Sequence, residues 1–557
     1  MSASVLTLTA LIGIVSGGAT YATNDGAGIS AVVSGQYTGV PVGQMFFSSR
    51  IIAIPISWLY MIVPGIGWYA LLQLSLVLLE SILIIWQLEN NQSLIAWTAL
   101  LFPIIVWSAW RPDYTFTALI VSSLSVISWS LTLSTPVRHR SVLLIAITTT
   151  VMFFGASWRP AAALVGFAIF LPTWFLMFAL RSKFNYGFLL IFLLPAAAVV
   201  EEGMRVLQSD SWTSWESFNK IRGELHGSSS LTLFADKIDF GWSAAAVRLF
   251  QSFAYTDDPV FGYQSLLQLS QRLPSVLAAP GTNLYEIVIY GLKPLLDFWW
   301  IAIPSLLIAI GLAIASGTLN RSLALLLITT SAYWALLIIV IGLLRLPGNL
   351  LVPIVVSIGL AVALHVSLIH TPGIPGYPLP VLLGRSIIST GMLFTLIYGA
   401  IGQNGVIALW NQGRLLQVQA EEYRSLLAKS RECVSYVSTP SADAGFTMVQ
   451  PYTSSSVYSL PVLTLGWHVP SPAWVDRKSK VLGGRGVLEA LRTRGSDTPR
   501  PGVCLLSNEV LANDIASVMS EFGYGYFVPV RVFSLPASSS GYAWRFIESR
   551  PPAQSEG

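Results

Sequence analysis

The chain has 557 residues, of which 54% are hydrophobic and only 10% are charged, and its mean hydropathy is +0.66. A soluble globular protein carries about 25% charged residues, so this composition excludes an ordinary soluble domain and predicts an integral membrane protein. The net charge of +4 provides no basic face for nucleic acid.

Apolar stretches recur along residues 1–402, and crossing a bilayer takes about 20 apolar residues. The N-terminal stretch, up to residue 22, lacks the basic region of a signal peptide, so we read it as a retained first membrane helix. The predicted spans are 3–20, 67–88, 93–110, 114–133, 141–157, 160–180, 185–202, 294–316, 322–344, 348–369 and 384–402.

A further apolar stretch, 44–64, is ambiguous because it contains Arg50 and Pro55. Loop charge decides its place, since cytoplasmic loops carry the excess of Lys and Arg. Counted from the span 114–133 onward, the basic short loops all face one side, and the long loop 203–293 and the tail 403–557 face the other side. If 44–64 also crossed the membrane, the N-terminus would lie outside, so we read 44–64 as a helix in the outer interface. The sequence therefore predicts about 11 membrane-spanning helices, a cytoplasmic N-terminus and an extracytoplasmic tail.

The polar tail has a different composition from the rest of the chain. Residues 403–432 read as a connecting helix, and 433–557 as a small α/β domain. Its short β-like runs and helix-compatible segments alternate, separated by Pro, Gly and Ser. The β-like runs are 446–452, 457–469, 502–506 and 524–535, and the helical segments are 486–494 and 508–521. Cys433 and Cys504 form either one disulfide or two unpaired thiols.

Polar residues gather at the predicted outer ends of the spans. Asp25 follows the first span, Arg111 and Asp113 follow the third in Trp-Arg-Pro-Asp-Tyr, and Arg159 repeats the Trp-Arg-Pro pattern. A charged group at a membrane boundary often marks function. The alternative is a solvated turn for Asp25 and interfacial anchoring for the arginines.

The long outer loop 203–293 adds further candidates. These are Asn219, Arg222 and the pair Asp257-Asp258. Residues 213–226 are also compatible with an amphipathic helix whose charges simply face solvent. A last outer cation, Arg345, follows the span 322–344 and reads either as an interface anchor or as a phosphate ligand.

The chain contains none of the common soluble catalytic motifs. It has no G-x-S-x-G, H-E-x-x-H or P-loop sequence, and its five His are scattered, so no metal cluster is predicted. Within the predicted spans, Glu80 is the main ionisable residue. This scarcity argues against an ion-coupled transporter.

Taken together, these motifs resemble the GT-C superfamily of membrane glycosyltransferases, and more distantly the phage-type glucosyltransferases of surface polysaccharide. The resemblance covers about residues 1–400 and does not extend to the tail. The superfamily's first motif usually has two adjacent acids, and here only Asp25 is present. The motifs are Asn24-Asp25, Tyr37-Thr38-Gly39-Val40-Pro41, Pro64-Gly65-Ile66-Gly67-Trp68-Tyr69, Phe218-Asn219-Lys220-Ile221-Arg222 and Asp257-Asp258-Pro259-Val260-Phe261.

The resemblance implies a GT-C-like core in a bacterial plasma membrane. It implies a polyprenyl-phosphate-linked sugar as donor and a cell-envelope glycan or glycolipid as acceptor. Asp25 would be the general base, and Asp113 would orient an arginine, bind the acceptor or assist a metal. A divalent cation, Mg or Mn, stays open, with no ligand set defined. Binding of the donor phosphate is assigned to Arg345, Arg111 and Arg159. Other contacts to the substrates are assigned to Asn24, Asn219, Arg222, Asp257 and Asp258.

Three other functions compete with this one. A polysaccharide polymerase or ligase outside GT-C would show an arginine-rich outer loop, and the arginines of 203–293 are dispersed. A transporter or flippase is disfavoured by the few charges within the spans. A non-catalytic envelope scaffold accounts for the tail but not for the clustered outer motifs.

Overall fold

We describe the protein from a computed structural model. It describes residues 2–88, 94–134, 138–172, 209–226, 242–257, 259–272, 351–369, 406–443, 449–453, 459–493, 502–535 and 541–549, with the single residues 310, 387, 390 and 446.

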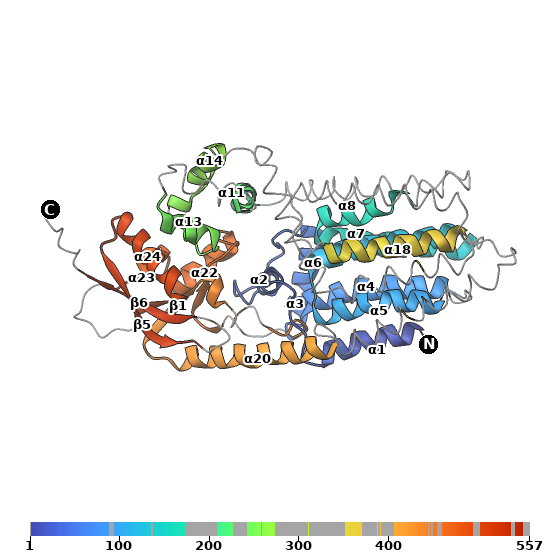
Figure 1. Cartoon of the computed structure of the whole chain (residues 1–557), viewed down its shortest axis with the longest axis horizontal. Coiled ribbons are helices and arrows are strands. Elements are labelled where there is room, and N and C mark those ends of the chain that lie inside the picture. Colours follow the sequence, from blue (N-terminus) through green and yellow to red (C-terminus); the bar gives the residue numbers. More distant parts are fainter. Residues whose placement is uncertain are drawn as a thin grey trace.

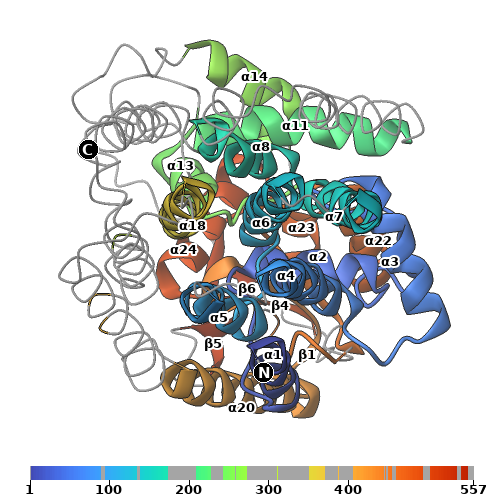
Figure 2. The same ribbon diagram turned by 90° about the vertical axis from the view of Figure 1, so that its right-hand side faces the viewer.

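An elongated bundle of apolar helices forms one end of the molecule (Figure 1). Viewed along the bundle, α6 lies at the centre and packs against α4, α7, α8 and α18 (Figure 2). Helix α6 is rich in Ser and Thr, and buried hydroxyls join it to its neighbours, as between Ser125 and Glu80 at 2.9 Å. The bundle consists of α1 (Ser2–Val15), α4 (Trp68–Gln87), α5 (Leu94–Trp110), α6 (Tyr114–Ser134), α7 (Arg138–Trp158), α8 (Pro160–Ile169) and α18 (Leu351–Ile369).

The number of membrane-spanning helices corrects the sequence prediction. Within the described ranges, only α4 and Tyr114–Thr132 of α6 are long and apolar enough to cross a bilayer. The other apolar helices there, including α1, α5 and α8, have 10–17 residues. The predicted fold class, about 11 spans around a GT-C-like core, is therefore wrong. The predicted spans 185–202, 294–316, 322–344 and 384–402 lie outside the described residues, apart from the single residues 310, 387 and 390.

Two short helices lie where the bundle meets the rest of the chain. Helix α2 (Asn24–Val33) begins at the N-cap Thr23, whose hydroxyl accepts a hydrogen bond from the Gly26 N–H. Helix α3 (Arg50–Ile62) is capped in the same way by Ser49. At 13 residues, α3 is too short to cross a bilayer. The interfacial position of 44–64 stays a prediction.

The chain then continues through α20 (Val406–Lys429) into a mixed α/β unit (Figure 1). Its six-stranded sheet has the order β2-β1-β4-β6-β3, with β5 paired to β6. Strands β2, β1 and β4 are parallel, whereas β6 runs antiparallel to β4 and β5. The strands are β1 (Cys433–Ser438), β2 (Val462–Thr464), β3 (Arg492–Thr493), β4 (Gly502–Ser507), β5 (Phe527–Ser534) and β6 (Tyr542–Glu548).

The centre of this unit is fixed by burial and by a covalent link. Strands β1 and β4 are almost wholly buried, as expected for parallel strands covered on both faces. Cys433 of β1 and Cys504 of β4 form a disulfide, which settles the alternative left open by the sequence. The helices of the unit are α22 (Pro472–Leu482), α23 (Val487–Leu491) and α24 (Glu509–Glu521), with the 3-10 turn η4 (Pro440–Ala442).

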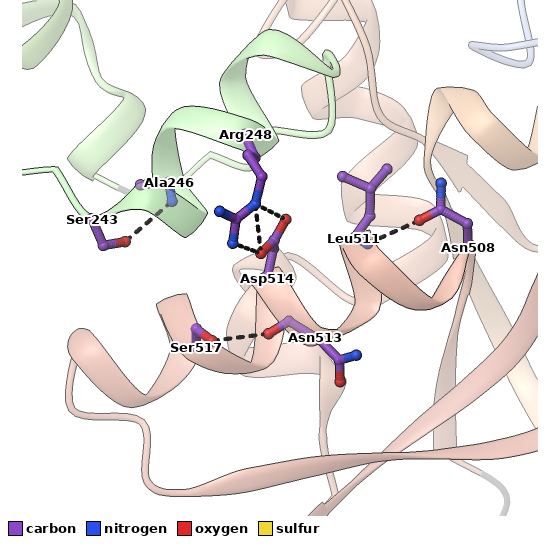
Figure 3. Close-up of polar contacts among 8 residues, drawn as sticks. All are labelled: Ser243, Ala246, Arg248, Asn508, Leu511, Asn513, Asp514 and Ser517. Atoms are coloured by element: carbon purple, nitrogen blue, oxygen red, sulfur yellow. Dashed lines mark hydrogen bonds and ion pairs between the residues drawn. The ribbon is translucent and has the colours of Figure 1, made fainter. Parts of the chain in front are cut away.

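Three helices from the long loop pack beside the α/β unit (Figure 1). They are α11 (Asp210–His226), α13 (Ala244–Gln251) and α14 (Tyr263–Arg272), with the 3-10 turn η1 (Pro259–Phe261) before α14. Arg248 of α13 holds Asp514 of α24 with its Nε 3.0 Å from the carboxylate Oδ2 (Figure 3). The long loop is therefore anchored to the tail.

The α/β unit is also fixed to the bundle itself. The Gly67 N–H donates to the Tyr452 carbonyl at 2.9 Å, and the Tyr452 hydroxyl donates to the Ala109 carbonyl at 2.8 Å. Gly67 is required here, because a Cβ at this position would lie 2.0 Å from the Pro451 carbonyl oxygen. These contacts hold the start of α4 and the end of α5 against the tail.

Candidate functional site

A cavity of about 130 Å³ lies between α2 and the α/β unit. Its volume has room for several waters or for one small ring of a ligand. One side of the cavity follows the carboxyl ends of the parallel strands β1 and β2, which is where open α/β sheets bind their ligands. The lining residues are Asp25, Gly28, Phe253, Pro440, Asp443, Thr464, Leu465, Gly466, Trp467 and His468.

Asp25 is the carboxylate that the bundle side presents to this cavity. It lies in the first turn of α2 and is partly buried. Burial, and less strongly the Asp113 carboxylate, raise the pKa of Asp25 from 3.8 to about 6, against the lowering effect of the Arg159 and Arg222 guanidinium groups. At neutral pH the Asp25 carboxyl is therefore mostly ionised and able to accept a proton, and its pKa lies closer to the working pH than that of an ordinary aspartate, as suits a general base.

Asp113, the second predicted catalytic residue, has a capping role. Its Oδ1 accepts hydrogen bonds from the N–H groups of Thr115 at 2.7 Å and Phe116 at 2.9 Å. It therefore caps the N-terminus of α6. Because Asp113 also raises the pKa of Asp25, it acts on the site through its charge.

Two arginines lie within electrostatic reach of Asp25. Arg159 donates to the Thr115 hydroxyl at 2.6 Å, at the capped end of α6. Arg222 is buried, and its guanidinium group donates to the Tyr255 hydroxyl at 2.6 Å and to the side-chain oxygen of Asn219. Two of the predicted cations and Asn219 are thus gathered around the predicted base.

The α/β unit contributes a histidine that the sequence did not single out. His468 Nε2 lies 3.1 Å from the Thr464 hydroxyl and 3.3 Å from the Tyr37 hydroxyl. Burial, together with the positive charge of Arg222, lowers the pKa of His468 to about 3, so the imidazole is neutral. Asp443 is also buried, and this raises its pKa well above the usual value.

A signal for this part of the site was present in the sequence. Residues 457–469 read as one β-like run, yet β2 ends at Thr464 and Gly466 has a φ of 142°. A glycine inside a strand pattern can mark such a break. The run therefore contains a strand followed by a turn, and that turn carries Trp467 and His468 to the cavity.

Other predicted site residues lie in structural contacts. Arg111 donates to the Thr20 hydroxyl and, at 2.9 Å, to Gln412 of α20. Asp257 accepts from Lys478 Nζ at 2.6 Å and from the Val487 N–H at 3.1 Å, which ties the long loop to α22 and α23. Like Arg159 and Arg222, these two residues do not line the cavity, but unlike them they are not among the groups whose charge shifts the pKa of Asp25.

The remaining predicted residues are only partly described. Asn24 opens α2, and its side chain lies outside the described part of the chain, as do Arg345 and Asp258. Within the described ranges, no group of three or more His, Cys, Asp or Glu side chains is placed to hold a metal ion. The divalent cation that the resemblance left open has no ready-made protein site there.

Comparison with known proteins gives no relative. No family model matches the chain, and no curated protein or solved structure matches it. The assignment of a function therefore rests on the cavity geometry and on the sequence motifs.

Proposed function

We propose that the protein transfers a sugar from a polyprenyl-phosphate-linked donor to a glycan or lipid acceptor of the cell envelope, with Asp25 as general base. The observation that carries this proposal is Asp25 itself. It is a partly buried carboxylate with a pKa of about 6 that lines a cavity and has two arginines within electrostatic reach. The sugar donor is taken from the motif resemblance.

The transfer needs one proton acceptor and one stabilised leaving group. An acceptor hydroxyl gives its proton to the Asp25 carboxylate while its oxygen attacks the anomeric carbon. The bond between that carbon and the donor phosphate oxygen breaks, and the electron pair leaves with the lipid phosphate. A single displacement of this kind inverts the anomeric centre.

Arg159 and Arg222 are the cations placed to stabilise the departing phosphate. Both act on Asp25 electrostatically, whereas Arg111 is bound to Thr20 and Gln412. Fixed positive charge in a partly buried site stabilises developing negative charge more strongly than it does in water. Arg222 is already bound to Tyr255 and Asn219, so it contributes charge rather than a free donor fork.

We place this reaction at the outer face of a bacterial plasma membrane. Two helices of the bundle are long and apolar enough to cross a bilayer. The disulfide between Cys433 and Cys504 supports an oxidising compartment for the α/β unit. The N-terminus lies at the opposite end of the bundle from that unit, which supports a cytoplasmic N-terminus (Figure 1).

A donor-consumption assay tests the proposal. The purified full-length chain would be incubated with a panel of polyprenyl-phosphate sugars and an envelope glycan extract, and release of the lipid phosphate would be measured. Asp25→Asn should lower turnover by at least about 100-fold. Asp476→Asn, a change at an exposed position of α22, should leave it unchanged. If the wild type consumes no donor, or Asp25→Asn keeps full turnover, the assignment is wrong.

A further inference from the structure

Two phenylalanines, one that lines the cavity and one that packs against a lining residue, have an unusual backbone conformation. Among the described residues, the non-glycine residues with positive φ are Phe47, at 62°, and Phe253, at 54°. This conformation is disfavoured for a bulky side chain and concentrates at ligand-binding sites. Phe253 lines the cavity, and Phe47 packs against Trp467, which also lines it. Both strained residues are thus associated with the same site.

The neighbouring residues Phe46 and Phe47 differ in how far their rings are buried. Phe46 is 1% exposed and packs against Trp212, Trp215 and Trp467, with ring centroids 4.7–5.5 Å apart. Phe47 is 37% exposed, and its ring lies 5.0 Å from that of Trp467. Burial accounts for Phe46 but not for Phe47. An exposed ring kept on a disfavoured backbone points to a ligand.

The walls of the cavity differ in chemistry. Asp25, Thr464 and His468 offer polar groups, whereas Trp467 and Phe253 offer aromatic surface. A pyranose ring has the matching surfaces, because its hydroxyls form hydrogen bonds and its C–H face packs against an aromatic ring. The cavity volume of about 130 Å³ has room for one such ring.

We propose that Phe47, Phe253 and Trp467 form the acceptor-sugar subsite, where one pyranose ring lies against Trp467 with a hydroxyl at Asp25. This inference rests on the proposed function. It assigns the ring to the acceptor because Asp25 takes the acceptor's proton, while the arginines attract the donor phosphate. It also gives the α/β unit a role, since Trp467 follows β2 of that unit.

Binding of soluble oligosaccharides tests the subsite without requiring turnover. The full-length chain in detergent would be titrated calorimetrically with hexasaccharides of glucose, galactose, mannose and N-acetylglucosamine. Trp467→Ala should weaken binding of the best ligand at least about tenfold, and Trp467→Phe should weaken it less. Trp58→Ala, at an exposed tryptophan of α3, should bind as the wild type does.

A second variant, Phe47→Gly, tests the subsite with a change that should not unfold the protein. Glycine suits the left-handed backbone at this position, so the unfolding temperature should stay at or above the wild-type value while affinity falls several-fold. Because the titration contains no sugar donor, it measures the subsite separately from the proposed reaction. If no hexasaccharide binds the wild type, or if Trp467→Ala and Phe47→Gly both bind with wild-type affinity, the subsite is wrong whatever the donor assay shows.

Discussion

The burial that raises the pKa of Asp25 for its proposed role as a base also lowers the stability of the fold at neutral pH. The pKa of this carboxyl rises from 3.8 in the unfolded chain to about 6 in the fold. Its contribution to stability is therefore fully present below pH 3.8 and is lost as the pH rises through about 6. At neutral pH the folded state carries a penalty of up to about 3 kcal/mol.

Replacing Asp25 by asparagine should therefore stabilise the protein while abolishing turnover. We expect Asp25→Asn to increase the free energy of unfolding by about 1–3 kcal/mol at pH 8 and by little at pH 4. Thermal unfolding of the detergent-solubilised chain at both pH values measures this, with Asp476→Asn as the control. If the stability difference between Asp25→Asn and the wild type is no larger at pH 8 than at pH 4, Asp25 is not buried with a raised pKa.

Single residues show which site predictions the sequence could support. The motifs single out Asp25, Arg159 and Arg222, and the structure brings both arginines within electrostatic reach of Asp25. Asp113 sits beside them, but as a helix cap. His468 could not be placed from the sequence, because its position depends on how the tail folds against α2.

At the scale of elements, the contact between α13 and α24 holds the long loop to the tail. Arg248 is half exposed, whereas Asp514 is buried, and the guanidinium group bridges both carboxylate oxygens (Figure 3). A double-mutant cycle with Arg248→Ala and Asp514→Ala should give a coupling of about 1 kcal/mol that weakens in about 1 M salt. Arg248→Lys should keep part of it. Additive effects of the two alanine changes would show that the pair does not join these helices.

The elements also show why counting spans from hydropathy gave the wrong fold class. A hydropathy window measures composition and not what covers the helix. The whole candidate span of α6 is buried by protein in the bundle, whereas only half of that of α4 is buried. Helix α8 ends at Ile169 with a turn at Phe170, inside the predicted span 160–180. Several limits were close all the same, as with α5 at Leu94–Trp110.

At the scale of the whole molecule, the disulfide closes a large part of the tail into one covalent unit. Cys433 and Cys504 are 71 residues apart in sequence. We expect the double change Cys433→Ser and Cys504→Ala to lower the free energy of unfolding by about 2–4 kcal/mol. The denatured chain should take up maleimide-polyethylene glycol only after reduction. Labelling of the unreduced, denatured chain would contradict both the bond and the oxidising compartment.

The candidate site belongs to the whole molecule, because its two walls come from opposite ends of the chain. Asp25 lies in α2, and the turn that carries His468 follows β2, more than 400 residues later. The sequence indicated the polar motifs of the first wall and an α/β tail. It gave no means of docking one against the other, since that depends on contacts such as Gly67 with Tyr452.

The pH dependence of turnover tests the central claim, that Asp25 is a general base whose pKa is set by its buried surroundings. The wild-type rate should rise with pH through a midpoint near 6. Arg159→Gln removes a charge that lowers this pKa, so its midpoint should move to higher pH, whereas Arg111→Gln should leave the midpoint in place. A rate that does not change through this range, or a midpoint that is the same in Arg159→Gln as in the wild type, would contradict the account.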